Sequence, residues 1–209
     1  MKGFYNSIRL KKETLRFFYD NSRLIFMALF LLLGVLFGVV MEKNNWFSGM
    51  YDPVSAFSDF VSTRMKMSAF GVFLSSLCSN LIFLLLSYFC GAFLFGKPLC
   101  FFVPFFKGLG IGCVCSAAYS VLGVNGIAFS ALIILPGGLI SSLTLLFSCL
   151  SAYDISAKLY KDFFKGEGSG FPELFKKYCF KYIKYISIMI MSSLTECAVT
   201  SLFLSAFSM

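Results

Sequence analysis

Five long apolar runs, separated by polar connections, dominate the sequence. They cover approximately residues 24–41, 69–95, 99–122, 126–152 and 185–206. Each is long enough for an α-helix to cross a bilayer, which takes about 20 residues with a range of about 17–25. The pattern predicts an all-α, polytopic membrane bundle of about five transmembrane helices, forming one integral membrane domain over all 209 residues.

The composition excludes most other classes of protein. Apolar residues make up 58% of the chain and charged residues 13%, whereas a soluble domain has about 45–50% and about 25%. A soluble fold of this size has too little interior for so much hydrocarbon, and a disordered chain requires a far more polar composition.

The residues that usually carry metal binding and catalysis are scarce. The chain has no His and eight Cys, of which seven lie within the apolar runs, and no two Cys have the C-x-x-C spacing. Such cysteines are typical of small apolar packing residues rather than of metal or redox sites. We therefore expect no metal site, no cofactor and no catalytic residues, and hence a protein that is not an enzyme.

Lys and Arg are distributed unevenly between the two sides of the predicted bundle. Fourteen of the 18 lie in residues 1–23 and in the second and fourth connections, against three in the first connection. Because positively charged connections stay in the cytoplasm, the N-terminus is predicted inside and the C-terminus outside. The basic side then faces anionic headgroups, which favours membrane lipids over nucleic acid as its partner.

The first connection, over residues 42–68, carries an apolar stripe at helical spacing. The stripe consists of Val54, Phe57, Val61 and Met65. This spacing indicates a short amphipathic helix on the outer membrane surface. It serves either as a docking surface for a partner protein or as a filler of the membrane interface.

Two ionisable residues fall inside the apolar runs, Lys107 in the third and Glu196 in the fifth. A charged side chain at the centre of a membrane helix costs at least about 2.5–3.5 kcal/mol, so each needs a partner. At 1.5 Å per residue the two lie ~12 and ~16 Å from the cytoplasmic ends of their runs. We expect them to face each other in the bundle, as a static bridge or as a proton or ion relay.

Other polar and small residues are arranged on helix faces. Asn80 lies on a polar face of the second run, and Gly108 and Gly112 form a small-xxx-small pattern in the third. Such faces let another helix approach closely, although a substrate path remains the alternative.

The fourth run is interrupted near its middle by Pro136, Gly137 and Gly138. Proline lacks the donor for the preceding turn and glycine adds no side-chain support, so the helix is predicted to kink or break there. Transporters use such breaks to bind ions, whereas a scaffold would use one as a bend.

The joint spacing of these residues resembles the stage II sporulation protein M family. The match is carried by Asn80, Gly91, Gly96, Pro98, Lys107, Gly108, Gly112, Gly123, Gly126 and Pro136. It covers roughly residues 20–165. Many family members have Pro-His-Gly followed by an acidic residue where this chain has Pro136, Gly137 and Ser141, so the roles of those polar side chains do not transfer.

The resemblance implies a multi-pass protein of the bacterial cell membrane with a role in endospore formation. It implies membership of a complex with stage II sporulation proteins D and P, two peptidoglycan-degrading proteins that act in engulfment of the forespore. On this basis the chain is a non-enzymatic scaffold that recruits hydrolases to the septal wall. The alternative is a small transporter, or a transporter subunit, that uses Lys107, Glu196 and the broken fourth span.

The predicted orientation can be tested by labelling single introduced cysteines from either side of the membrane. We expect positions 52–59 and 209 to react from outside, and Arg9→Cys and Lys165→Cys to react from the cytoplasm. A cytoplasmic C-terminus would mean an even number of spans and a re-entrant segment at Pro136.

Overall fold

The computed structural model describes residues 21–44, 63, 66–165 and 171–203. Almost all of these residues are helical, and no strand occurs among them. The elements in chain order are α2 (Ser22–Lys43), α4 (Ala69–Ala92), α5 (Gly96–Leu122), α6 (Val124–Phe129), the π-helical segment η1 (Ser130–Ile134), α7 (Leu135–Lys165) and α8 (Phe171–Phe203). The apolar stripe of Val54, Phe57, Val61 and Met65 lies outside the described residues.

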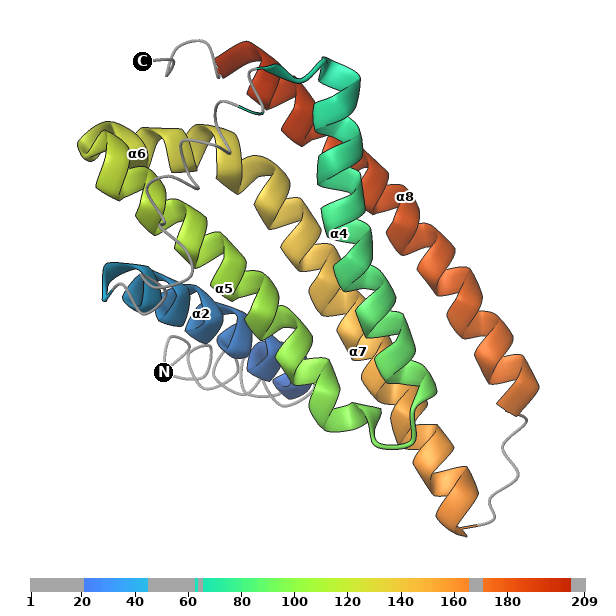
Figure 1. The fold of residues 1–209 in the computed structure, drawn as a ribbon. Coiled ribbons are helices and arrows are strands. Elements are labelled where there is room, and N and C mark those ends of the chain that lie inside the picture. The colour runs from blue at the N-terminus through green and yellow to red at the C-terminus, as the bar shows by residue number, and fades with distance from the viewer. Residues whose placement is uncertain (1–20, 45–62, 64–65, 166–170, 204–209) are drawn as a thin grey trace, which may run out of the picture.

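The structure confirms the helical membrane bundle. Five helical segments among the described residues are long and apolar enough to cross a membrane. The fourth runs from Val124 to Asp162 over 39 residues, which is about 58 Å at 1.5 Å per residue and nearly twice the ~30 Å hydrocarbon core. It therefore exceeds the predicted run 126–152, and it both bends and extends past the loop between α4 and α5 (Figure 1).

The fifth helical span also begins earlier than its apolar run, because the Lys-rich residues before it are helical. The candidate span covers Glu173–Leu202 and includes Lys176, Lys177 and Lys181. Lys has a good helix propensity, and its long stem lies along apolar surface while the ammonium reaches water. The ends of α7 and α8 thus form a basic extension on the predicted cytoplasmic side.

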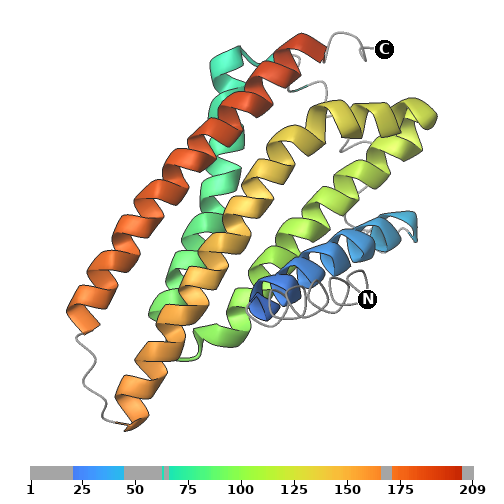
Figure 2. The same ribbon diagram turned by 180° about the vertical axis from the view of Figure 1, so that it is seen from behind.

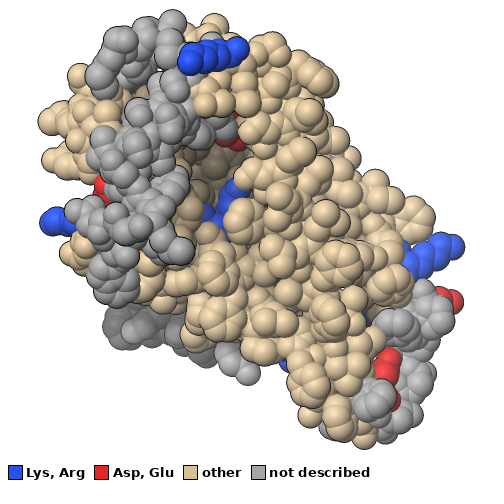
Figure 3. Space-filling view, in the orientation of Figure 1, with Lys and Arg blue, Asp and Glu red and all other residues tan. Residues whose placement is uncertain are grey.

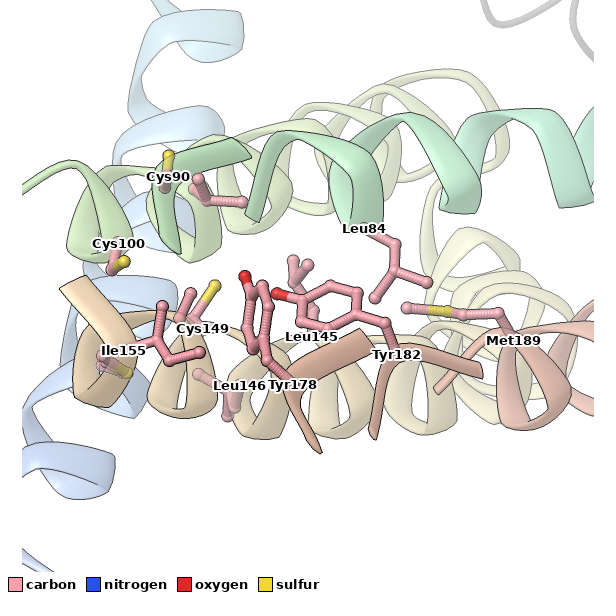
Figure 4. Packing of buried hydrophobic residues seen from close by; sticks show 13 residues of the cluster. Leu84, Cys90, Cys100, Leu145, Leu146, Cys149, Ile155, Tyr178, Tyr182 and Met189 are labelled. Carbon is pink, nitrogen blue, oxygen red and sulfur yellow. The ribbon is translucent and has the colours of Figure 1, made fainter. Parts of the chain in front are cut away.

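Four long helices form the body of the bundle, and α2 lies on its outside (Figures 1 and 2). Helix α4 packs against both α7 and α8, α5 packs against α7, and α2 packs mainly against α5. The main buried cluster lies between α4, α5, α7 and α8, and the side chains of Cys149, Tyr178 and Tyr182 lie at its centre (Figure 4). The lipid-facing sides remain apolar and exposed, as at Leu36 and Phe70.

Hydrogen bonds between hydroxyl groups join three helices within this cluster. The Ser87 hydroxyl of α4 lies 2.9 Å from the Ser148 hydroxyl of α7 and 2.9 Å from the Tyr182 hydroxyl of α8. Nearby, Tyr178 donates to the backbone carbonyl of Tyr88 over 2.9 Å. Each bond satisfies a buried polar group and fixes the position of one helix against another.

Glycines bring α2 and α5 into backbone contact. A Cβ at Gly108 would overlap the carbonyl oxygen of Leu31, and one at Gly112 would overlap that of Val35. From the other side, Gly34 meets the backbone of Phe105 and Gly38 meets that of Leu109. The small-xxx-small face of α5 therefore packs against an equivalent face of α2, and close packing of this kind drives helix association in lipid.

This contact makes a specific demand on glycine that a matched pair of variants can measure. We expect Gly108→Ala to destabilise the protein by about 1–3 kcal/mol, because the added methyl group collides with backbone that cannot rotate away. Gly110→Ala should be neutral or slightly stabilising, since nothing lies within 4 Å of a Cβ there. The measurement is denaturant unfolding in detergent micelles. Equal behaviour of the two variants would contradict the close α2–α5 contact.

Candidate functional site

The ammonium group of Lys107 lies inside the bundle and donates a hydrogen bond to α4. The donor Nζ is 2.7 Å from Oδ1 of Asn80 and 5.1 Å from the ring centroid of Phe83. Asn80 is 3% exposed, so its amide is held in place by packing. The bond to an amide oxygen and the contact with the ring face both stabilise the positive charge.

Asn80 was predicted to lie on a polar face of its helix, but its role as the partner of Lys107 was not predicted. The signal that could have found it is the i, i+3 pair of Asn80 and Phe83, which puts an acceptor oxygen and an aromatic face on one side of α4.

Glu196 lies on the neighbouring wall of the same region. Its carboxylate attracts the Lys107 ammonium electrostatically, although α5 and α8 share no extensive helix contact among the described residues. A Cβ built on Gly137 would lie 2.9 Å from Cβ of Glu196, so the absence of a side chain at Gly137 lets Glu196 pack against α7. The glycine thereby helps to place the carboxylate.

The irregular part of the fourth span lies immediately before Pro136. Residues Ser130–Ile134 form a π-helix, and the Leu135 amide donates to the carbonyl of Ser130, five residues back. Pro136 has no N–H to continue the ladder, and the shift to wider turns accommodates that loss. Pro136, Gly137 and Gly138 are themselves helical and belong to the first turn of α7. The span bends here rather than breaking open (Figure 1).

Helix α8 satisfies one backbone group next to this bend. The hydroxyl of Ser192 donates to the carbonyl of Gly137 over 2.8 Å. Ser193 and Thr200, one turn before and after Glu196, are both buried. Polar side chains of α8 thus line the contact with α7, as irregular backbone at membrane depth requires.

The surface of the molecule is hollowed between the helices in this region. Figure 3 shows basic and acidic atoms recessed at the wall of a hollow that is bordered partly by uncharged residues. Lys107 and Glu196 are both partly exposed rather than fully buried. In the part of the chain that the structure describes, no group of three or more His, Cys, Asp or Glu residues could hold a metal ion.

A second polar contact joins the C-terminal end of α2 to α5. Glu42 accepts hydrogen bonds from the hydroxyls of Ser116 and Ser120 in α5, the latter over 3.0 Å. At the predicted cytoplasmic end Arg23 pairs with Asp154 of α7 over 2.8 Å. These contacts join both ends of α2 to the bundle.

Comparison with known proteins identifies the family. The family model described as Stage II sporulation protein M matches residues 17–207. The chain belongs to the Stage II sporulation protein M family. It is accordingly a sporulation-related, multi-pass membrane protein. The match includes α8 and Glu196, beyond residues 20–165, where the resemblance was expected. No curated protein and no solved structure gives a significant match.

If Lys107 and Glu196 compensate each other's charge, removing Lys107 alone should destabilise the protein more than removing both residues together. Lys107→Met should lower abundance and thermal stability, because it leaves Glu196 without its nearby positive charge. The double variant Lys107→Met with Glu196→Leu should recover both, because apolar side chains replace the two charges. Membrane abundance and thermal unfolding in detergent are the measurements.

Lys184→Met, on the exposed side of α8, serves as the control that removes a lysine without touching the bundle interior. It should leave both quantities unchanged. Two unstable single variants whose losses add up in the double variant, with no recovery, would show that the residues do not pair.

Proposed function

We propose that the protein is a non-enzymatic scaffold of the bacterial cell membrane. It recruits peptidoglycan hydrolases to the septal wall and so promotes engulfment of the forespore. The family relationship supports a role in sporulation, and the resemblance to its members suggests stage II sporulation proteins D and P as the partners. The chain itself contributes a rigid membrane platform.

This proposal rests on the observation that the buried hydroxyl groups form hydrogen bonds between helices. The hydroxyls of Ser87, Ser148 and Tyr182 bond to one another across three helices, and Ser156 bonds to the carbonyl of Phe93 over 2.9 Å. These groups fix helix positions and do not converge on a point where a substrate would react. Rigid placement of helices is what a recruiting platform needs, because a fixed surface loses little entropy when it binds.

The proposed docking surface is the outer stripe of Val54, Phe57, Val61 and Met65. Its spacing predicts one apolar face on a helix at the outer membrane surface, where hydrolases of the wall would act.

Replacement of two residues of the stripe tests this docking surface. The variant Phe57→Ser with Val61→Ser should reduce co-purification of the hydrolases at least about tenfold, because it removes two apolar anchors worth more than about 1 kcal/mol each. Membrane abundance should stay normal. Ser55→Ala with Thr63→Ala alters the same stretch off the stripe and should retain the partners. Full retention in the Phe57 and Val61 variant would move the interface to the spans.

A second candidate function, transport, is favoured by one observation. A charged pair lies beside a π-helical bend in the fourth span, and such bends at membrane depth accompany ion and substrate sites. If the pair takes part in transport, the double variant of Lys107 and Glu196 should be abundant yet inactive. If the protein is a scaffold, the same variant should support sporulation.

A further inference from the structure

The hollow between the helices contains both signs of charge. Within the apolar runs the sequence has one basic residue, Lys107, and one acidic residue, Glu196. Both are partly exposed, and basic and acidic atoms are visible at the wall of the hollow (Figure 3). Asn80, which accepts the Lys107 hydrogen bond, lies at the middle of α4, so the region is at membrane depth and not at either end of the bundle.

The charge balance of the hollow restricts what can bind there. A purely anionic ligand would neutralise Lys107 and leave Glu196 without its counter-charge at membrane depth. A purely cationic ligand would do the reverse. Since an unbalanced charge inside the membrane costs at least about 2.5–3.5 kcal/mol, a ligand fits best when it presents one group of each sign.

The positive end of the hollow is preorganised. Lys107 has three N–H donors, of which one is directed at Asn80 over 2.7 Å, and its Nζ lies 5.1 Å from the ring centroid of Phe83. The remaining ammonium donors are available to further acceptors, such as an acidic group of a ligand and Glu196. Groups held in place before binding lose little entropy when they bind, which favours recognition.

A buried hydroxyl lies at the level of Lys107 without a partner. Cys100 of α5 and Cys149 of α7 lie side by side (Figure 4), and α5 and α7 run in opposite directions. Lys107 lies two turns after Cys100 in α5, and Ser142 lies two turns before Cys149 in α7. Because the helices are antiparallel, both residues lie at about the same level of the bundle. The Ser142 hydroxyl is buried and has no hydrogen-bond partner in the described structure, so it can serve an acceptor bound to Lys107.

The negative end depends on Gly137. The Glu196 side chain packs against the backbone of Gly137. A Cβ at residue 137 would lie 2.9 Å from Cβ of Glu196 and 3.2 Å from Cγ of Glu196. At the next residue, Gly138, nothing lies within 4 Å of a Cβ. The two adjacent glycines therefore differ sharply in their effect on the carboxylate.

From these observations we propose that the hollow between Lys107 and Glu196 binds a zwitterion. Its acidic group would accept hydrogen bonds from Lys107 and Ser142, and its ammonium group would donate to Glu196. The same chemistry is offered by a phosphatidylethanolamine headgroup and by a free amino acid. This site is independent of the recruitment of hydrolases, and either property can fail without the other.

The test uses the full chain purified in nanodiscs. In a mixture of phosphatidylethanolamine and phosphatidylglycerol, native mass spectrometry should show at least about tenfold selective retention of the former if the ligand is a headgroup. If the ligand is soluble, L-alanine should raise the thermal unfolding temperature, while lactate, which lacks the ammonium group, should not. Absence of both effects overturns the proposal.

Variants connect binding to the site itself. Glu196→Gln should lower binding of the responding probe at least about tenfold by removing one charge-assisted hydrogen bond, whereas Glu173→Gln, exposed near the start of α8, should not. Should Glu196→Gln fail to accumulate, Gly137→Ala should weaken binding by displacing Glu196, and Gly138→Ala should leave it unchanged. Undiminished binding in Glu196→Gln, or equal binding in the two glycine variants, overturns the proposal.

Discussion

The structure depends on one constraint, which is that every polar group inside a bilayer must find its partner within the protein. Apolar contact contributes little to holding these helices together, because lipid tails are as apolar as the side chains that they replace. Hydrogen bonds across helices and close backbone contact therefore determine the assembly. The Ser87, Ser148 and Tyr182 hydroxyls supply the first, and the glycines of α2 and α5 supply the second.

The same constraint explains where the molecule departs from regularity. Proline in a membrane helix removes a donor that water cannot replace, so neighbouring residues must adjust around it. Here η1 widens the turn before Pro136, and Ser192 of α8 satisfies the carbonyl of Gly137. Glu196 approaches at the same place because Gly137 has no side chain. Irregular backbone and a carboxylate are thus brought together at one turn.

The sequence was sufficient to predict the helices, because the length and polarity of each run directly reflect the thickness of the bilayer. It was also sufficient to single out Lys107, Glu196 and the small face of α5. It did not reveal that α2 covers that face, or that Asn80 receives the Lys107 hydrogen bond. A helical period shows which residues share a face, but every small or polar face fits several neighbours equally well. The π-helix was missed for a related reason, since a proline indicates disturbance without specifying which hydrogen bonds rearrange.

The packing of α2 on α5 has a consequence for the order in which the protein assembles. The Cys113 thiol of α5 donates to the carbonyl of Gly38 in α2, 75 positions earlier in the chain. At about 5–20 residues per second of synthesis, α2 must remain in the bilayer for about 4–15 s before its partner emerges. During that interval its glycine face meets lipid or another nascent helix. The glycine face of α2 therefore cannot reach its final contact until the third span has been inserted, and the fidelity of biogenesis depends on keeping that face free of competing partners.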